Sequence, residues 1–241
     1  MEQPESTAVI ANVVRPQGTL LHALLALWPY KLCAPIVGLS AFFFAYFWVL
    51  AHPLFTVTVM PLTWFDRAIP FTPLALPWYL SLWPYLLLAP GLIERRGELG
   101  FYYLGTVALA VIGLTIFLLW PTAVPQPDIN WAAYPDMDFL KTVDRAGNAC
   151  PSLHVAFCVF TALWNARMLK RVGDRGPFRV LSALWCVAIV WSTLATRQHV
   201  ALDVLAGAAL GAALAAIHLH WHTRRYGRVT GVVCPPTLDG H

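Results

Sequence analysis

Two short segments of the chain carry side chains suited to acid–base and phosphoryl chemistry. The first, DRAGNACPSLH, covers residues 144–154, and the second, TRQHVALD, covers residues 196–203. Each lies at the end of a long apolar stretch, where a membrane-spanning helix would reach the membrane surface. We therefore expect the two segments to form one active site for phosphate esters.

His199 and Asp203 are four residues apart, which is about one turn of a helix. A carboxylate at this spacing can accept the Nδ1 proton of the imidazole and leave Nε2 as a nucleophile or a base. The alternative is an ion pair or polar contact at the start of a helix. Because ionisable residues inside membrane segments are costly and usually functional, the catalytic interpretation is favoured.

Ser152 and His154 stand at the start of another apolar stretch, where Ser152 is a candidate N-cap. The free amides and the dipole of a helix start favour an anion, although a simple capping sequence is the alternative. Arg197 could offer a forked donor to two phosphate oxygens. Lys141 and Arg145 are the other nearby cations, and a solvated-loop interpretation is open for both.

These residue types allow phosphoryl transfer without a metal ion or another cofactor. One histidine attacks phosphorus, and the other protonates the departing alkoxide, while cations and amides hold the equatorial oxygens. A hydrolase that uses Ser152 or Cys150 as nucleophile is an alternative, but no nucleophile-elbow glycines surround Ser152. The carboxylates of the loop 121–150 lack EF-hand spacing, so we interpret them as solvated.

The composition predicts an all-α membrane protein and is unlike that of a soluble domain. Of 241 residues, 59% are hydrophobic and 12% are charged, and the mean hydropathy is +0.62. Residues 1–32 are expected to form an N-terminal segment with an interfacial helix, residues 33–221 the membrane domain and residues 222–241 a cytoplasmic tail. The apolar stretches predict a polytopic bundle of about six transmembrane helices: 33–51, 74–92, 101–120, 153–169, 178–195 and 200–221.

The basic residues predict the orientation in the membrane. With six crossings both termini share one side, and most Lys and Arg residues fall on that side, including the run from 167 to 179. The positive-inside rule makes this side cytoplasmic. The candidate site then faces the periplasm or the exterior of a plasma membrane, such as a bacterial inner membrane.

The last apolar stretch contains Gly207 and Gly211 in a GxxxG pattern, which lets a second helix approach closely. The two glycines, His199 and Asp203 recur every four residues, so we expect them on one face, toward the bundle interior. Three alternating histidines follow, and we interpret them as interfacial because residues two apart do not share a helix face: His218, His220 and His222.

The segments ACPSLHVA and TRQHVALDVLAG resemble the second and third motifs of the type 2 phosphatidic acid phosphatase superfamily, which includes bacterial acid phosphatases and vanadium haloperoxidases. PSLH, where phosphatases have PSGH, and AIPFTPLALPWYLSLWPY are similar to the branch near inositol phosphorylceramide synthases. The resemblance extends over roughly residues 64–211. It implies that His199 attacks phosphorus and that Asp203 orients it. It also implies that His154 is the general acid and that Ser152 contacts phosphate.

Three cations of the family pattern are missing. Leu119 and Gln126-Pro127 stand where the first motif has a lysine and an Arg-Pro pair, and Thr193 stands where the third motif has an arginine. The cations named above would have to compensate, or the substrate carries less charge. A phosphodiester carries about one negative charge where a monoester carries nearly two, which favours a transferase or a diester substrate.

We therefore expect an integral-membrane lipid phosphatase, or an inositolphosphotransferase-like transferase, that works through a phosphohistidine at the outer membrane face. Water or an alcohol could accept the phosphoryl group. The alternative is a non-catalytic transporter or scaffold with a degenerate site, which the missing cations support. The expected partners are the lipid phosphate substrate and the membrane, with no nucleic acid, and the oligomeric state is not predicted.

Overall fold

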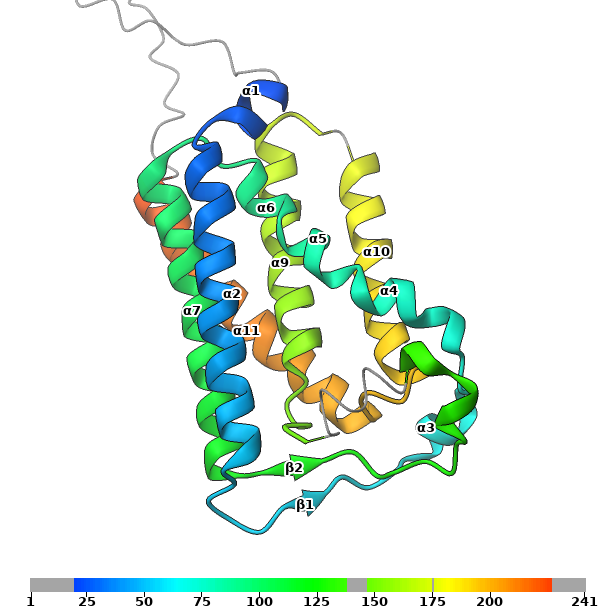
Figure 1. Ribbon diagram of the computed structural model, residues 1–241. Helices are drawn as coiled ribbons and strands as arrows, with labels where there is room; N and C mark the ends of the chain where they lie inside the picture. The colour runs from blue at the N-terminus through cyan, green and yellow to red at the C-terminus, as the bar shows by residue number, and fades with distance from the viewer. Residues whose placement is uncertain (1–19, 138–146, 175, 227–241) are drawn as a thin grey trace, which may run out of the picture.

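The chain folds into a bundle of long helices, with a two-stranded sheet and short helices at one end (Figure 1). The structure is a computed structural model and describes residues 20–137, 147–174 and 176–226. Two predicted site residues, Lys141 and Arg145, lie outside these ranges. The elements in chain order are α1 (Leu20–Leu25), α2 (Trp28–Ala51), β1 (Thr58–Val59), α3 (Trp64–Ala68), η1 (Pro73–Ala75), α4 (Leu76–Leu80), α5 (Leu82–Leu86), α6 (Leu88–Gly91), α7 (Arg96–Leu119), β2 (Thr122–Ala123), η2 (Trp131–Ala133), α9 (Leu153–Arg171), α10 (Pro177–Ala195) and α11 (Ala201–Tyr226).

Four of the described helices, α2, α7, α10 and α11, are long and apolar enough to cross a membrane. The chain thus has the make-up of an integral membrane protein. The predicted count of about six is not confirmed, because the stretch 74–92 is divided among several short helices and α9, which carries polar residues in its second half, is not among the four. Pro77, Pro84 and Pro90 explain the division, since proline lacks the amide that a continuous helix needs.

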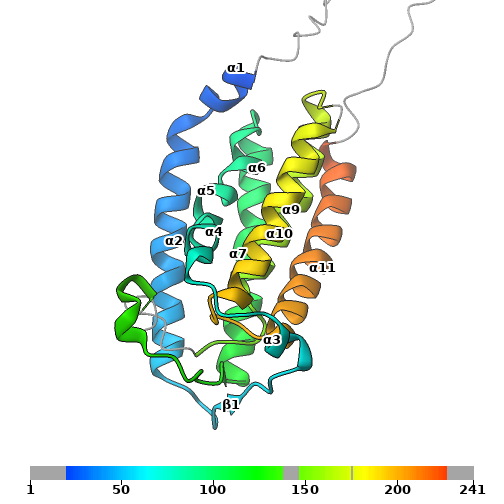
Figure 2. The same ribbon diagram turned by 90° about the vertical axis from the view of Figure 1, so that its right-hand side faces the viewer.

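α9 is the central helix of the bundle. It packs most extensively against α11 and α10, and it also contacts α5, α6 and α7. Figures 1 and 2 show it among these neighbours. Phe160, Trp164 and Met168 of α9 are fully buried and join Tyr102 and Leu109 of α7 in one apolar cluster. Such close van der Waals packing holds α9 inside the bundle.

Two glycines of α11 let this helix pack directly against the backbone of α9. A Cβ atom built at Gly207 would lie 2.3 Å from the Ser152 carbonyl oxygen, and one at Gly211 would lie 2.3 Å from that of Ala156. Both distances are far below van der Waals contact, so the close approach predicted from the GxxxG pattern is confirmed. It places the starts of α9 and α11, with their histidine segments, side by side.

The two ends of the bundle carry different features. At one end β1 and β2 pair in parallel, with Thr58 opposite Thr122 and Val59 opposite Ala123, and α3 lies at the same end. α1 and the last turns of α11 lie at the other end (Figure 2). The first and last described residues therefore share one side of the bundle, as an even number of crossings requires.

A buried ionic cluster joins three helices at the end opposite to α3. Glu98 of α7 is fully buried and accepts a hydrogen bond from Arg171 of α9, and His222 Nε2 of α11 lies 2.6 Å from Glu98 Oε1. The interfacial interpretation is therefore wrong for His222, because its ring pairs with a carboxylate in the interior, whereas His220 is exposed. α11 also continues to Tyr226, beyond the expected end of the membrane domain.

Candidate active site

The backbone of Ser152 joins the start of α9 to α11. Its amide donates a hydrogen bond to the Asp203 carbonyl oxygen at 3.0 Å. Its hydroxyl caps α9 by accepting a hydrogen bond from the Val155 amide at 3.3 Å, so the predicted N-cap is confirmed. Because Ser152 is fully buried and already serves the helix start, its contact with phosphate stays a prediction.

His199 lies just before α11 and approaches the Asp203 carboxylate. Its Nδ1 atom is 3.6 Å from Asp203 Oδ2, which is an ion-pair distance but too long for the hydrogen bond predicted from the spacing. The Oδ2 atom instead accepts a hydrogen bond from the Val200 amide at 3.0 Å. Asp203 is fully buried, so its charge acts on the imidazole with little screening.

His154 is held by the proline-rich segment that precedes α7. Its ring stacks on Tyr79 of α4, with ring centroids 4.0 Å apart and planes 15° apart, and Trp83 of α5 approaches it edge-on. The imidazole hydrogen bonds with the Tyr79 backbone and interacts electrostatically with His199. Its Nε2 atom is buried and has no hydrogen-bond partner within the described ranges. Tyr79 was missed as a site residue, because its segment equally suits a kinked helix.

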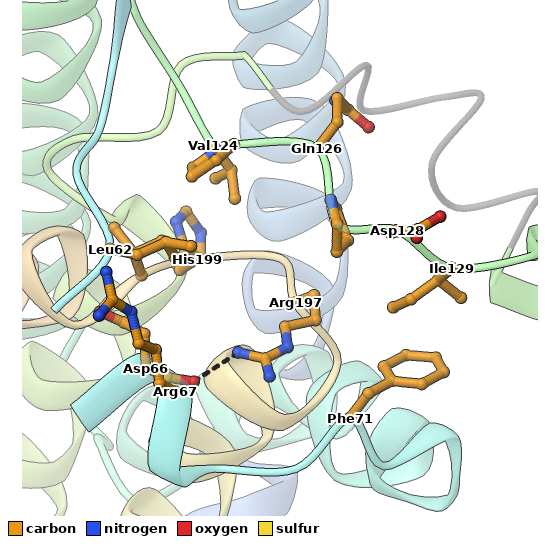
Figure 3. Close-up of a pocket in the computed structure, with 13 residues that line it drawn as sticks. Leu62, Asp66, Arg67, Phe71, Val124, Gln126, Asp128, Ile129, Arg197 and His199 are labelled. Carbon is orange, nitrogen blue, oxygen red and sulfur yellow. Dashed lines mark hydrogen bonds between the residues drawn. The ribbon is translucent and has the colours of Figure 1, made fainter. Parts of the chain in front are cut away.

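A cavity of about 270 Å³ lies beside His199 (Figure 3). Its walls come from the segment around α3, the loop after β2 and the turn before α11. Among the predicted site residues that the structure describes, His199 and Arg197 line the cavity, whereas Ser152, His154 and Asp203 do not. The polar side chains on its walls are those of Asp66, Arg67, Gln126, Asp128, Arg197 and His199.

Arg197 braces the segment around α3. Its Nη1 atom donates to the Asp66 carbonyl oxygen at 2.7 Å, and its Nη2 atom donates to the Ile69 carbonyl oxygen at 2.8 Å. The backbone φ of Arg197 is 57°, a left-handed conformation at the turn between α10 and α11. The forked donor that was predicted to bind phosphate is therefore engaged with backbone carbonyls, while its positive charge remains at the cavity.

Asp66 links α3 to the start of α11, and sequence reasoning did not identify it as a site residue. Its Oδ1 atom accepts a hydrogen bond from the Ala201 amide at 2.7 Å. Its Oδ2 atom accepts from the Thr63 amide at 2.8 Å and from the Thr63 hydroxyl at 2.6 Å. The spacing Thr63-x-x-Asp66 is a readable capping box, but a contact with Ala201 across the chain leaves no local signal.

The structure argues against Cys150 as a nucleophile. Cys150 is buried, and its burial, together with the nearby charge of Asp203, raises the pKa of the thiol to about 11. A thiol with this pKa is protonated and unreactive at neutral pH.

Within residues 20–137, 147–174 and 176–226, no three His, Cys, Asp or Glu side chains gather closely enough to hold a metal ion.

The positions that depart from the family pattern have different surroundings. Gln126 and Pro127, in the Arg-Pro position of the first motif, line the cavity with His199. Thr193, in the arginine position of the third motif, is fully buried, and its carbonyl oxygen accepts hydrogen bonds from the amides of Gln198 and His199 at 3.0 and 3.1 Å. Thr193 thus shapes the turn that presents His199 and does not itself supply a charge.

The sequence profile of the PAP2 superfamily matches residues 99–226, a region that runs from α7 to α11 and contains both histidine segments. No match was found among curated proteins or among solved structures. The matched region leaves out α3 and α4, so Asp66, Arg67 and Tyr79 lie outside it. Because the match covers more than half of the chain, the chain belongs to the PAP2 superfamily, whose members are generally phosphatases or phosphotransferases.

Proposed function

We propose that the chain is a membrane enzyme that cleaves the phosphate ester of a lipid phosphate through a phosphohistidine at His199. The observation that carries the proposal is the position of His199 on the wall of a cavity that also contains Arg67 and Arg197. A second imidazole, that of His154, interacts electrostatically with the first. Two cations and a nucleophile around one small cavity, with a second imidazole behind the nucleophile, suit a phosphoryl substrate. Membership of the PAP2 superfamily supports the same class of reaction.

In the proposed reaction, His199 Nε2 attacks phosphorus while the bond from phosphorus to the leaving oxygen breaks. The Asp203 carboxylate stabilises the positive charge that the attacking imidazole gains. His154 delivers a proton to the departing alkoxide and then takes a proton from the acceptor that attacks the phosphohistidine. Water as the acceptor yields inorganic phosphate, and an alcohol yields a new phosphate ester.

The proposed transferase form rests on two features of the site. The sequence PSLH, with Leu153 in place of glycine, is similar to the branch near inositol phosphorylceramide synthases. The uncharged Gln126 occupies the position of the first-motif arginine. Fewer cations suit a phosphodiester better than a phosphomonoester, because the diester carries about one negative charge. A lipid alcohol or an inositol would then be the acceptor.

In the proposed topology the chain crosses the membrane six times. Two of the six crossings, α9 and the proline-rich segment α4–α6, are not uniformly apolar. Both lie among the apolar helices (Figures 1 and 2), where neighbouring helices can satisfy backbone groups freed by proline. Exposed basic residues gather at the end of the bundle with α1, including Arg95, Arg96, Arg224 and Arg225. By the positive-inside rule that end is cytoplasmic, so α3 and the cavity face the exterior of the plasma membrane.

The proposal is tested with purified protein and vesicles that contain labelled phosphatidic acid, with and without inositol or diacylglycerol. His199→Ala should lower turnover by about 10³-fold or more and should abolish an acid-labile phosphoprotein. His220→Ala is the matched control, because His220 is an exposed histidine on α11. Free phosphate as the sole product, with no labelled ester of inositol or diacylglycerol, would exclude transfer from phosphatidic acid. Full turnover by His199→Ala would exclude the phosphohistidine mechanism, whereas no turnover by the wild type would exclude catalysis and leave a transporter or scaffold.

A further inference from the structure

Two arginines line the cavity beside His199, but their guanidinium groups have different surroundings. Both terminal nitrogens of Arg197 donate to backbone carbonyl oxygens, at 2.7 and 2.8 Å. The Arg67 side chain is exposed and makes no hydrogen bond or ion pair with the described part of the chain. Figure 3 shows both side chains at the cavity with His199.

We propose that Arg67 binds the oxygens of the phosphoryl group that is transferred, while Arg197 acts as a brace and a background charge. This inference rests on the proposed function, since it identifies the group that holds the anion next to His199. A guanidinium group presents two parallel N–H donors that match two oxygens of one phosphate. Arg67 lies outside residues 99–226, so the family match assigns it no role.

α3 holds Arg67 in a fixed position relative to the His199 turn. The neighbouring residue, Asp66, is 2% exposed and accepts three hydrogen bonds, one of them from the first amide of α11. The carbonyl oxygens on either side of Arg67, those of Asp66 and Ile69, accept the two bonds from Arg197. Because the backbone is tied in this way, only the torsions of the Arg67 side chain are ordered when the anion arrives.

The two carboxylates of the cavity, those of Asp66 and Asp128, differ in their expected effect on the binding of an anion. The charge of Asp66 is compensated by its three donors, and its side chain is buried. Asp128, in contrast, is exposed on the cavity wall and opposes a bound anion. Removing the Asp128 charge should therefore strengthen anion binding, whereas removing the Arg67 charge should weaken it.

The experiment measures binding of orthovanadate to the full-length detergent-solubilised protein, through the rise in its unfolding temperature with vanadate concentration. Arg67→Ala should weaken binding by about 10- to 100-fold, Arg67→Lys by less, and Asp128→Asn should tighten it a few-fold. Arg224→Ala, at an exposed position on the opposite end of the bundle, is the charge-loss control and should bind as the wild type does. Turnover of phosphatidic acid by each variant is measured in parallel.

Two results would overturn the inference: vanadate affinity unchanged in Arg67→Ala, or no stabilisation of the wild type by vanadate. If Arg67→Ala unfolds without ligand, Arg67→Lys decides, because it keeps the charge and removes only the fork. Failure of the proposed function is recognised separately. In that case vanadate binding depends on Arg67, but turnover does not depend on His199.

Discussion

Gly207→Ala tests whether close contact between α9 and α11 sets the geometry of the site. The added methyl group would lie 2.3 Å from the Ser152 carbonyl oxygen, and ordinary contact begins at 3.4 Å. The two helices must therefore move apart locally by about 1.1 Å, the difference between these distances. The obstacle is backbone, which no side-chain rotation can relieve. The same movement stretches the 3.0 Å hydrogen bond from the Ser152 amide to the Asp203 carbonyl oxygen.

Gly207→Ala should lower kcat for phosphatidic acid by about 10²-fold, because a shift of about 1 Å between catalytic groups has that effect. KM should change less, since the cavity walls come from α3, the loop after β2 and the turn at Arg197. Overpacking should destabilise the protein by about 1–3 kcal/mol. For a chain of this size that is a fall of several degrees in the unfolding temperature.

The matched control is Gly100→Ala in α7, where a Cβ atom would meet nothing within 4 Å. This variant should keep full activity and gain a little stability, because alanine favours a helix by about 1 kcal/mol over glycine. The reasoning is refuted if Gly207→Ala keeps kcat and unfolding temperature close to those of the wild type. Equal losses in both glycine variants would also refute it, since the loss would then not depend on the contact between α9 and α11.

Further predictions concern the groups around the site and at the opposite end of the bundle. Asp66→Asn should lower the unfolding temperature by several degrees and reduce kcat, because one amide oxygen cannot accept all three hydrogen bonds that the carboxylate receives. Thermal unfolding and turnover measurements test this prediction, and unchanged values would contradict it. Glu98→Gln should cost about 3 kcal/mol of stability while the folded fraction keeps its turnover number, as measured by active-site titration; a selective loss of kcat would contradict it. Treatment with N-ethylmaleimide at pH 7 should leave turnover unchanged, because the pKa of about 11 keeps the Cys150 thiol protonated until the pH approaches that value. The prediction is contradicted if the reagent inactivates the wild type but not Cys150→Ser.

The sequence predicted the features that depend on local patterns. The apolar stretches predicted the long helices, the glycine pair of α11 predicted its approach to α9, and Ser152 was recognised as a cap. These signals are readable because each depends on residues within a few turns of one another. The prolines between residues 73 and 90 account for the division of the expected span 74–92 into short helices.

The sequence could not predict contacts that depend on the folded path of the chain. The Asp66 carboxylate and the Ala201 amide that it binds are 135 residues apart. Arg197 was expected to bind phosphate, but the turn it occupies directs both terminal nitrogens to carbonyl oxygens near α3. Tyr79 was missed because an aromatic residue among prolines has no distinctive spacing, and only the folded path of the chain, which packs α4 against α10, stacks its ring on His154.

The hydrogen bond from the first amide of α11 to Asp66 limits which fragments of the protein can keep the geometry of the site. A fragment that began at α7 would keep every residue of the family match, both histidine segments included. It would nevertheless lose the acceptor for the Ala201 amide and the carbonyl oxygens that engage Arg197. His199 would then lie on a turn without these contacts, so the region of the family match does not by itself contain the groups that hold this turn. Transplanting the site into another scaffold would require the α3 segment as well.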